Sequence, residues 1–480
     1  MTITMTTNTS NGTIDQHGNR MTGTADAVAL YDQTLDRLLR YDVAVLGLAE
    51  RLMTEAADAP MTSVLLAYLS LSSTDAADVA VARDFVAALQ TMPTNERESM
   101  HTTALAAWCD GDWVGASKRL DDLLQVYPTD LLALMVGHQL DFFLGDNLNL
   151  RDRVGRTLPS IEASHPHRGL VLGMQAFGLE EAGSYHQAEQ AGLAALAANA
   201  DDVWAVHAVA HVMEMQGRVE DGIRFMTDRT SDWGSGNLFS VHNWWHLGIY
   251  CLEAGRHDAA LGIYDREIHH SGSSSVPLEM LDASAMLWRF RLDGAETGGR
   301  FDALADSWAT KVADEPWYAF NDVHAAMALV GAGRLAEART LVARLDSYLD
   351  TAGGTNASMT AEVGLPASRA ILAHGEGRWA DVVAELAPIR RRLHHFGGSH
   401  AQRDALQRTL LDASIRVGDL PRAQSLINER LALRPTSVFG WVQQERVHTA
   451  NGNGAAAAAA RATGMLHLDR FATAAKKAAL

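Results

Sequence analysis

Two histidine pairs with the same spacing are the strongest chemical signal in the chain. In WAVHAVAHVMEMQGR, His207 and His211 are followed by Glu214, and HNWWHLGIYCLEAGR carries His242 and His246. A spacing of four residues places both imidazoles of a pair on one face of a helix. The same spacing binds zinc in the H-E-x-x-H motif, although here the glutamate follows the pair. The two pairs therefore indicate either a divalent metal site for zinc or iron, or acid–base catalysis near neutral pH.

A structural role explains the same residues without any chemistry. Each histidine would then be a core residue that bonds to a neighbouring helix or to water. The chain contains 20 histidines, so some pairs at this spacing are expected by chance. The sequence leaves both alternatives open.

Further polar residues stand where an inner helix face is expected. WYAFNDVHAAMAL carries Asp322 and His324, whose burial in so apolar a segment is costly unless they are paired. We expect both to lie across from the four histidines and to take part in catalysis. GHQLDFFLGD carries His138, which we expect to contact the substrate together with Glu214.

The stretch GGSHAQRD combines a helix start with an anion-binding pattern. Ser399 and Gln402 form a capping-box sequence at the start of a helix, which is a sufficient structural explanation. His400 and Arg403 would project from its first turn, and an arginine beside a helix N-terminus suits a carboxylate or phosphate. We expect these two residues to bind a substrate anion.

Tryptophans flank the polar residues. Trp204 and Trp245 precede or adjoin the histidines and could form the walls of a pocket for an aromatic or apolar ligand. The alternative is that they only pack the start of their helices.

The elements that must position these residues follow a repeat. A glycine recurs, followed two residues later by a mostly bulky residue and five residues later by a mostly small or apolar one. These glycines are Gly111, Gly145, Gly183, Gly217, Gly255, Gly299, Gly333, Gly377, Gly418 and, weakly, Gly452. Four of the intervals equal the 34-residue tetratricopeptide period. Between them, apolar residues recur at helical spacing, so each glycine is predicted at the turn of a helical hairpin.

The predicted fold is all-α. We expect a tetratricopeptide-like solenoid of about ten to eleven hairpins, curved around a central groove or pocket. The first helices of successive hairpins would line the inner wall, which makes the two histidine-bearing helices neighbours. The array would span residues 25–480 and end in C-terminal capping helices. Residues 1–24 are polar and lack apolar periodicity, which predicts a disordered tail.

Composition narrows the partners. The formal net charge is −18, from 58 acidic and 40 basic residues, so neither nucleic acid nor an anionic membrane is expected as a partner. No run of 18 apolar residues predicts a membrane span, and the N-terminus does not look like a signal peptide. Two cysteines suit a reducing compartment, so we expect a cytoplasmic protein.

Five stretches resemble the tetratricopeptide repeat protein 38 family. They are AFGLEEAGSYHQAEQAG, HAVAHVMEMQGR, HNWWHLGIYCLEAGRHDAALGIYD, FNDVHAAMAL and GGSHAQRD, in matching order between about residues 100 and 450. The resemblance implies an all-α repeat fold but no particular reaction. It marks eight motif positions, all present here: His207, His211, His242, His246, Asp322, His324, His400 and Arg403.

Two functions fit these observations. The first is a small-molecule enzyme, a hydrolase or lyase, whose central pocket is lined by His, Asp and Glu and works with or without a metal. The alternative is a tetratricopeptide-type interaction scaffold that binds a peptide or protein on its concave face. Peptide-binding arrays typically carry Lys, Arg and Asn clamps, whereas this chain offers imidazoles and tryptophans, which favours a small-molecule ligand.

Overall fold

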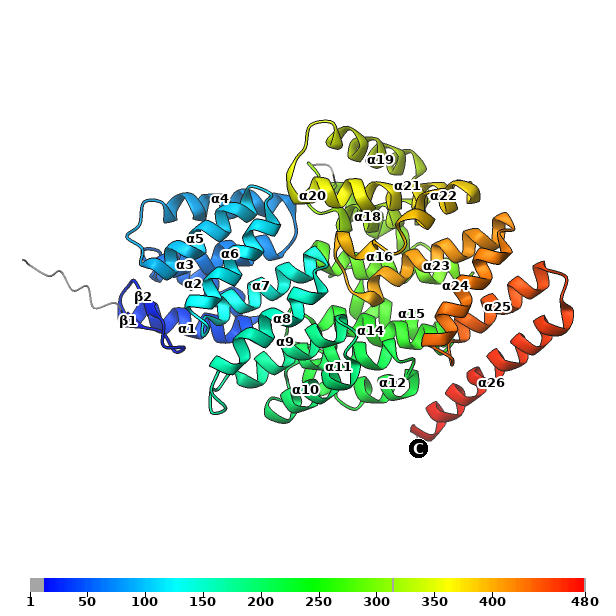
Figure 1. Ribbon diagram of the computed structural model, residues 1–480, viewed down its shortest axis with the longest axis horizontal. Coiled ribbons are helices and arrows are strands. Elements are labelled where there is room, and N and C mark those ends of the chain that lie inside the picture. The colour runs from blue at the N-terminus through cyan, green and yellow to red at the C-terminus, as the bar shows by residue number, and fades with distance from the viewer. Residues whose placement is uncertain (1–12, 313–314, 479–480) are drawn as a thin grey trace, which may run out of the picture.

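The computed structural model describes residues 13–312 and 315–478 as a succession of antiparallel helix pairs (Figure 1). The repeat glycines join the two helices of a pair, and all except Gly299 have a positive φ. Glycine adopts this conformation without strain because it has no Cβ, so the chain can reverse within a few residues. At the exception, Gly294 and Gly298 make the turn and Gly299 is the N-cap of the next helix. The predicted all-α helical-hairpin fold is confirmed.

The hairpins share one pattern, a first helix that runs inside and a second that lies outside. They are α1 (Ala25–Leu39) with α2 (Ala44–Glu55), α3 (Pro60–Ser72) with α4 (Ala76–Leu89), α5 (Glu96–Cys109) with α6 (Trp113–Val126), α7 (Leu131–Leu144) with α8 (Asn147–Thr157), α9 (Arg168–Glu181) with α10 (Tyr185–Ala198), α11 (Val203–Met215) with α12 (Val219–Thr227), α14 (Ser240–Glu253) with α15 (His257–Ile263), α16 (Pro277–Leu292) with α17 (Arg300–Lys311), α18 (Ala319–Gly331) with α19 (Leu335–Leu349), α21 (Leu365–Gly375) with α22 (Trp379–Ile389), α23 (His400–Val417) with α24 (Leu420–Leu433), and α25 (Val438–Ala450) with α26 (Gly454–Ala478).

Short elements fill the longer intervals between hairpins. They are η1 (Leu158–Ser160), α13 (Thr230–Trp233), η2 (Tyr264–Ile268), α20 (Gly354–Met359), η3 (Thr360–Gly364) and η4 (Leu393–Phe396). No helix in the described part of the chain is both long and apolar enough to cross a lipid bilayer.

Burial separates the inner helices from the outer ones. Nearly every residue of α11, α16 and α18 is buried, including their polar residues. The outer helix α10 buries only a stripe of small and apolar residues, as expected of a surface helix. Polar side chains on the inner helices therefore need partners inside the protein.

Helix α23 supplies many of these partners because it runs along the inner face of the array. The Arg289 guanidinium of α16 donates to the carbonyl of Ala401 at 2.5 Å, and Trp288 Nε1 donates to Thr409 Oγ1 at 2.9 Å. Arg408 of α23 donates to Glu253 of α14 at 2.7 Å. Helix α23 therefore covers part of the inner faces of α14 and α16.

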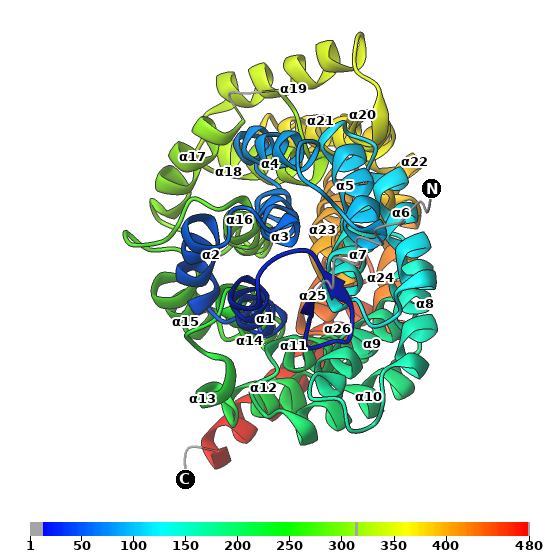
Figure 2. The same ribbon diagram turned by 90° about the vertical axis from the view of Figure 1, so that its left-hand side faces the viewer.

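Contacts between distant segments also close the array on itself. Asn321 of α18 donates to the carbonyl of Thr74, after α3, at 3.0 Å, and Lys311 forms an ion pair with Asp75. In the view along the long axis the N-terminal helices overlap α16 and α18 (Figure 2), and these two contacts are made by the turn between α3 and α4. Early and late repeats thus contact each other directly.

The N-terminal segment differs from its prediction. Residues 13–24 include an antiparallel pair of short strands, β1 (Thr13–Ile14) and β2 (Arg20–Met21). Asp15 is buried and lies 2.9 Å from the Arg97 guanidinium, while the Thr22 N–H donates to Glu98 at 2.7 Å. The expected disordered tail therefore does not apply to residues 13–24, because their polar groups bind partners on α5. Residues 1–12 lie outside the described residues.

Candidate functional site

The structure brings the two histidine pairs together between α11 and α14. The Nε2 atom of His242 lies 3.2 Å from Nε2 of His207 and 3.2 Å from Nε2 of His246. His211 completes the group, since one ring nitrogen of each residue lies within 4.8 Å of the other three. We call these four residues the four-histidine cluster.

Local contacts fix the register of the two helices. Asp202 caps α11 by accepting hydrogen bonds from two backbone N–H groups of its first turn. Asn243 of α14 donates to the carbonyl of Val203 at 3.2 Å, and the Tyr250 hydroxyl donates to the carbonyl of Ala210 at 2.5 Å. One of these bonds lies near each end of the α11–α14 contact. Together they fix the position of the two helices along each other, which places the imidazoles of both helices side by side.

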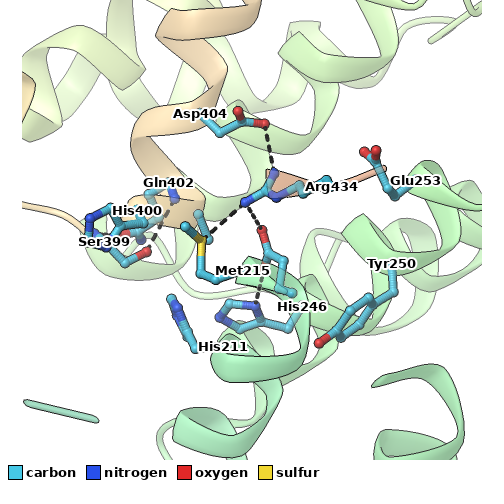
Figure 3. Close-up of polar contacts among 12 residues, drawn as sticks. His211, Met215, His246, Tyr250, Glu253, Ser399, His400, Gln402, Asp404 and Arg434 are labelled. Carbon is cyan, nitrogen blue, oxygen red and sulfur yellow. Dashed lines mark hydrogen bonds and ion pairs between the residues drawn. The ribbon is translucent and has the colours of Figure 1, made fainter. Parts of the chain in front are cut away.

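Carboxylates lie behind the imidazoles. His242 Nδ1 lies 2.7 Å from Asp282 of α16. His246, labelled in Figure 3, has its Nδ1 3.2 Å from Glu214. A carboxylate can only accept, so both Nδ1 atoms carry a proton, and in a neutral ring Nε2 then presents a lone pair. This carboxylate–histidine arrangement is the one that orients histidine ligands of metals.

The electrostatic environment favours neutral imidazoles. Burial, followed by repulsion among the neighbouring histidines, holds the pKa of His207, His211 and His246 well below the usual value of 6.5. The Nε2 atoms of His242 and His246 nevertheless face each other at 3.2 Å. Four nitrogens at 2.0–2.1 Å around a tetrahedral ion are separated by about 3.3–3.4 Å. The spacing therefore fits a shared cation.

A pair of glutamates extends the cluster toward α23. Glu180 Oε2 lies 3.5 Å from His211 Nδ1, and burial together with the neighbouring Glu181 raises the pKa of Glu180 well above its usual range. Burial also acts on Glu181, but His400 and Arg403 together lower its pKa. The two neighbouring carboxyls are thus shifted in opposite directions, and Glu181 is the one paired with cationic partners.

The predicted anion-binding pair is already engaged by the protein. His400 Nδ1 lies 3.0 Å from Glu181 Oε2, and Arg403 Nη2 lies 3.3 Å from the same oxygen. Arg403 also donates to the carbonyls of Gly397 and Gly398. The capping box of Ser399 and Gln402 is present as the sequence predicts. Arg403 therefore stabilises the start of α23, and its guanidinium fork is not free to bind an anion alone.

Asp322 lies apart from the cluster. Its carboxyl lines a small cavity with Thr74, Asp75 and Lys311, and burial raises its pKa to about 7. His324 stands two residues later, hence on nearly the opposite side of α18. Its Nδ1 donates to the carbonyl of Phe320 at 2.7 Å, and burial lowers its pKa to about 4. The prediction that Asp322 faces the four histidines is therefore wrong, because Asp322 lies beside Thr74, Asp75 and Lys311 instead.

The aromatic residues surround the cluster rather than a ligand space. Trp204 packs on His207 at 5.1 Å between ring centroids, and Trp245 stacks on His242 at 5.3 Å. His138 is buried between Phe177 and Trp204, and burial lowers its pKa to about 3. Neither tryptophan nor His138 lines the large cavity described next, so their contacts exclude water from the imidazoles.

A cavity of about 730 Å³ adjoins the cluster. We call it the central cavity, and it is bounded by α23, α24, η4 and the turn between α7 and α8. Its cationic and imidazole lining residues are Arg390, Arg391, His394, His395, His400, Arg403, Arg408, Arg430 and Arg434, against Asp146, Asp404 and Glu429. Its wall also includes Met215, which Figure 3 shows between His211 and the Arg434 side chain. Arg434 lies 3.6 Å from Glu214, the partner of His246.

Comparison with protein-family models gives no match. Similar solved structures include a human IFIT1 dimer with PPP-AAAA, at 11% identity and a TM-score of 0.40, covering 95% of each chain. They also include the APC/C hetero-tetramer Cut9–Hcn1, at 12% identity and a TM-score of 0.29, covering 94% of this chain and 96% of that one. These similarities add nothing beyond what the helical hairpins themselves establish, a tetratricopeptide-type helical-repeat fold.

Proposed function

We propose that this protein is a metal-dependent enzyme for a small anionic substrate. The four-histidine cluster holds a zinc or iron ion, and the central cavity binds the substrate. The observation that carries the proposal is the approach of the Nε2 atoms of His242 and His246 to 3.2 Å while carboxylates accept from both Nδ1 atoms. A metal ion in this position would act as a Lewis acid through a coordination position left open to water or substrate beside the imidazoles, which suits hydrolysis or elimination.

The surrounding residues orient the imidazoles and keep water away. Glu214 holds the Nδ1 proton of His246, and Arg434 keeps Glu214 in place from 3.6 Å. Trp204 and Trp245 cover the rings on the other sides. In the absence of a metal, the same carboxylate–histidine pairs support acid–base chemistry, since each carboxylate stabilises a protonated imidazole.

The lining of the central cavity supports an anionic substrate. Cationic side chains outnumber acidic ones, and no hydrogen bond or ion pair of Arg391 is seen within the described chain. Arg391 is therefore the cation most available to a carboxylate or phosphate. Met215 and the Arg434–Glu214 pair separate the cavity from His246, so the substrate reaches the cluster only when these side chains move.

The resemblance to the tetratricopeptide repeat protein 38 family supports the same residues. The four histidines occupy motif positions of that family, as do His324, His400 and Arg403. Membership in that family is part of this proposal.

An interaction scaffold is the second candidate, and the repeat fold itself favours it. Because α23 covers part of the inner face, the surface offered to a partner is the rim of the central cavity. An acidic peptide segment of a partner protein would suit its arginines.

Metal analysis of the purified full-length chain separates the candidates. We expect the total metal content to fall by about one equivalent of zinc or iron from the wild type to His242→Gln and to His246→Gln. His186→Gln is the matched control, because His186 is exposed on α10 and should not change the metal content. A metal content that is the same in the wild type and in both variants after loading with zinc or iron would contradict the metal site.

A further inference from the structure

A second group of imidazoles joins the N-terminal segment to the loop before α9. His17 comes from the turn between β1 and β2, and His165 and His167 come from the stretch SHPHR. Ring centroids lie 5.2 Å apart for His17 and His165 and 5.1 Å apart for His17 and His167. One ring nitrogen of each residue lies within 4.8 Å of the other two.

Two nitrogens in this group are buried without a partner. His167 Nε2 lies 2.9 Å from Asp36, so it carries the proton and leaves Nδ1 as a lone pair. That Nδ1 atom, like Nε2 of His17, has no hydrogen-bond partner within residues 13–312 and 315–478. Buried polar atoms rarely stay unpaired, so both atoms point to an absent ligand.

The third histidine completes a set of donors. His165 Nε2 lies 3.2 Å from His17 Nδ1, so the two rings are in contact. Its Nδ1 accepts the backbone N–H of His167 at 3.2 Å, a contact that the ring gives up when Nε2 binds a metal. His165 is only half-buried, so the ring can turn and solvent can reach the open side of the group.

The charge environment suits neutral ligands. Burial, reinforced by the two neighbouring imidazoles, lowers the pKa of His17 to about 3. Burial and His167 also lower the pKa of His165. Metal ligands must be unprotonated, and the lowered pKa of His17 and of His165 agrees with that requirement. Imidazole donors favour zinc, copper or nickel over magnesium or calcium.

We propose that His17, His165 and His167 bind one divalent transition-metal ion that fastens the N-terminal segment to the helical array. The ligands come from segments far apart in the sequence, so a bound ion restrains residues 13–24 directly. Asp36 of α1 orients His167 from behind, as a carboxylate does for other histidine ligands. This site shares no residue with the four-histidine cluster and does not depend on the proposed enzymatic function.

The test uses the full-length chain carrying His242→Gln and His246→Gln, so that the cluster is disabled. Zinc binding is measured by calorimetry, with magnesium as the comparison cation. We expect one zinc equivalent in this background, no comparable binding of magnesium, and at least about tenfold weaker zinc binding after His17→Gln or His165→Gln. His186→Gln serves as the control substitution.

A second readout links the metal to the hairpin. Hydrogen exchange of the backbone amides of residues 15–22 should slow when zinc is added to the background protein, and should not change in its His17→Gln form. The half-buried His165 provides a second variant if His17→Gln does not fold. The proposal is overturned if the background protein binds no zinc, or if neither substitution weakens binding. It is also overturned if zinc binds without slowing exchange in this segment.

Discussion

At the scale of single residues, the carboxylates decide what the imidazoles can do. Asp282 is fully buried, and its partners within the described chain are His242 at 2.7 Å and Gln402 at 3.3 Å, neither of which is a fixed cation. A buried carboxylate without a cation is destabilising. A divalent ion bound by the neighbouring histidines offsets that cost.

Asp282→Asn tests this role. Asparagine keeps the size of the side chain but removes the charge, so we expect metal affinity at the cluster to fall about 10–100-fold while the fold remains. Competition with a chromophoric chelator measures the affinity. Glu279→Gln on the same helix is the control, and unchanged affinity in Asp282→Asn would mean that the carboxylate does not tune the site.

Acid should destabilise the metal-free protein through its buried histidines. Burial and mutual repulsion lower the pKa of His207, His211 and His246 in the folded state, whereas they titrate near 6.5 when unfolded. Below pH 6.5 the unfolded chain therefore binds protons that the folded chain does not. The free energy of unfolding should fall on acidification, by up to about 1.4 kcal/mol per pH unit for each histidine.

Urea unfolding of chelator-treated protein at pH 7.5 and 5.5 measures this slope. His246→Gln removes one titrating group and should make the slope shallower, while His186→Gln should not. A stability that stays constant or rises toward pH 5.5 would contradict the burial of neutral imidazoles.

Helical spacing explains which site residues the sequence could predict. Residues four apart share a helix face in any helix, so each histidine pair could be inferred locally. Asp322 and His324 are two residues apart and therefore lie on different faces of α18. Helical spacing thus predicts that at most one of them faces the histidines. Asp282 and Arg434 come from other hairpins, and only a lone aspartate in the apolar stretch EMLDASAM hinted at the first.

At the scale of elements, the N-terminal segment is stabilised by polar contacts that composition hides. Its Thr, Asn and Gly content is typical of a disordered tail, yet its partners Arg97 and Glu98 stand far along the chain. The glycine turns were predictable because each needs only its own residue and its neighbours. The segment was not, because its stability depends on distant residues.

Asp15→Ala tests how much this segment contributes. The substitution removes the ion pair with buried Arg97 and the acceptor of the backbone N–H groups of His17 and Asn19. We expect the free energy of unfolding to fall by about 3 kcal/mol. This is the lower end of the cost of breaking a buried ion pair, because Arg97 still has Asp130 as a partner. Glu55→Gln, which breaks a fully exposed pair, should have a much smaller effect. Equal effects of the two changes in chemical denaturation would contradict a docked segment.

At the scale of the whole molecule, α23 and the contacts between early and late repeats couple distant hairpins. An open solenoid unfolds through neighbour contacts alone, so its ends can unfold separately. Here Arg408 of α23 bonds to Glu253 of α14. Asn321 of α18 bonds to Thr74 in the turn after α3, which connects a late repeat to an early one. The repeat period predicts the hairpins but not this closure, which depends on the curvature accumulated over all of them.

Calorimetry tests the coupling. We expect one cooperative transition for the wild type and a clear loss of melting temperature in Arg408→Ala, because Glu253 and Asp404 lose a buried partner. Arg416→Ala on the same helix is the control, since Arg416 is exposed. Two separate transitions in the wild type would show that the repeats unfold independently.

The most direct test of the central claim is X-ray absorption spectroscopy of the metal in the His17→Gln variant, in which only the four-histidine cluster remains intact. The account predicts zinc or iron with imidazole nitrogens at about 2.0–2.1 Å, and loss of this signature when His242→Gln is added. A metal surrounded only by oxygen atoms, or a spectrum unchanged by His242→Gln, would contradict it.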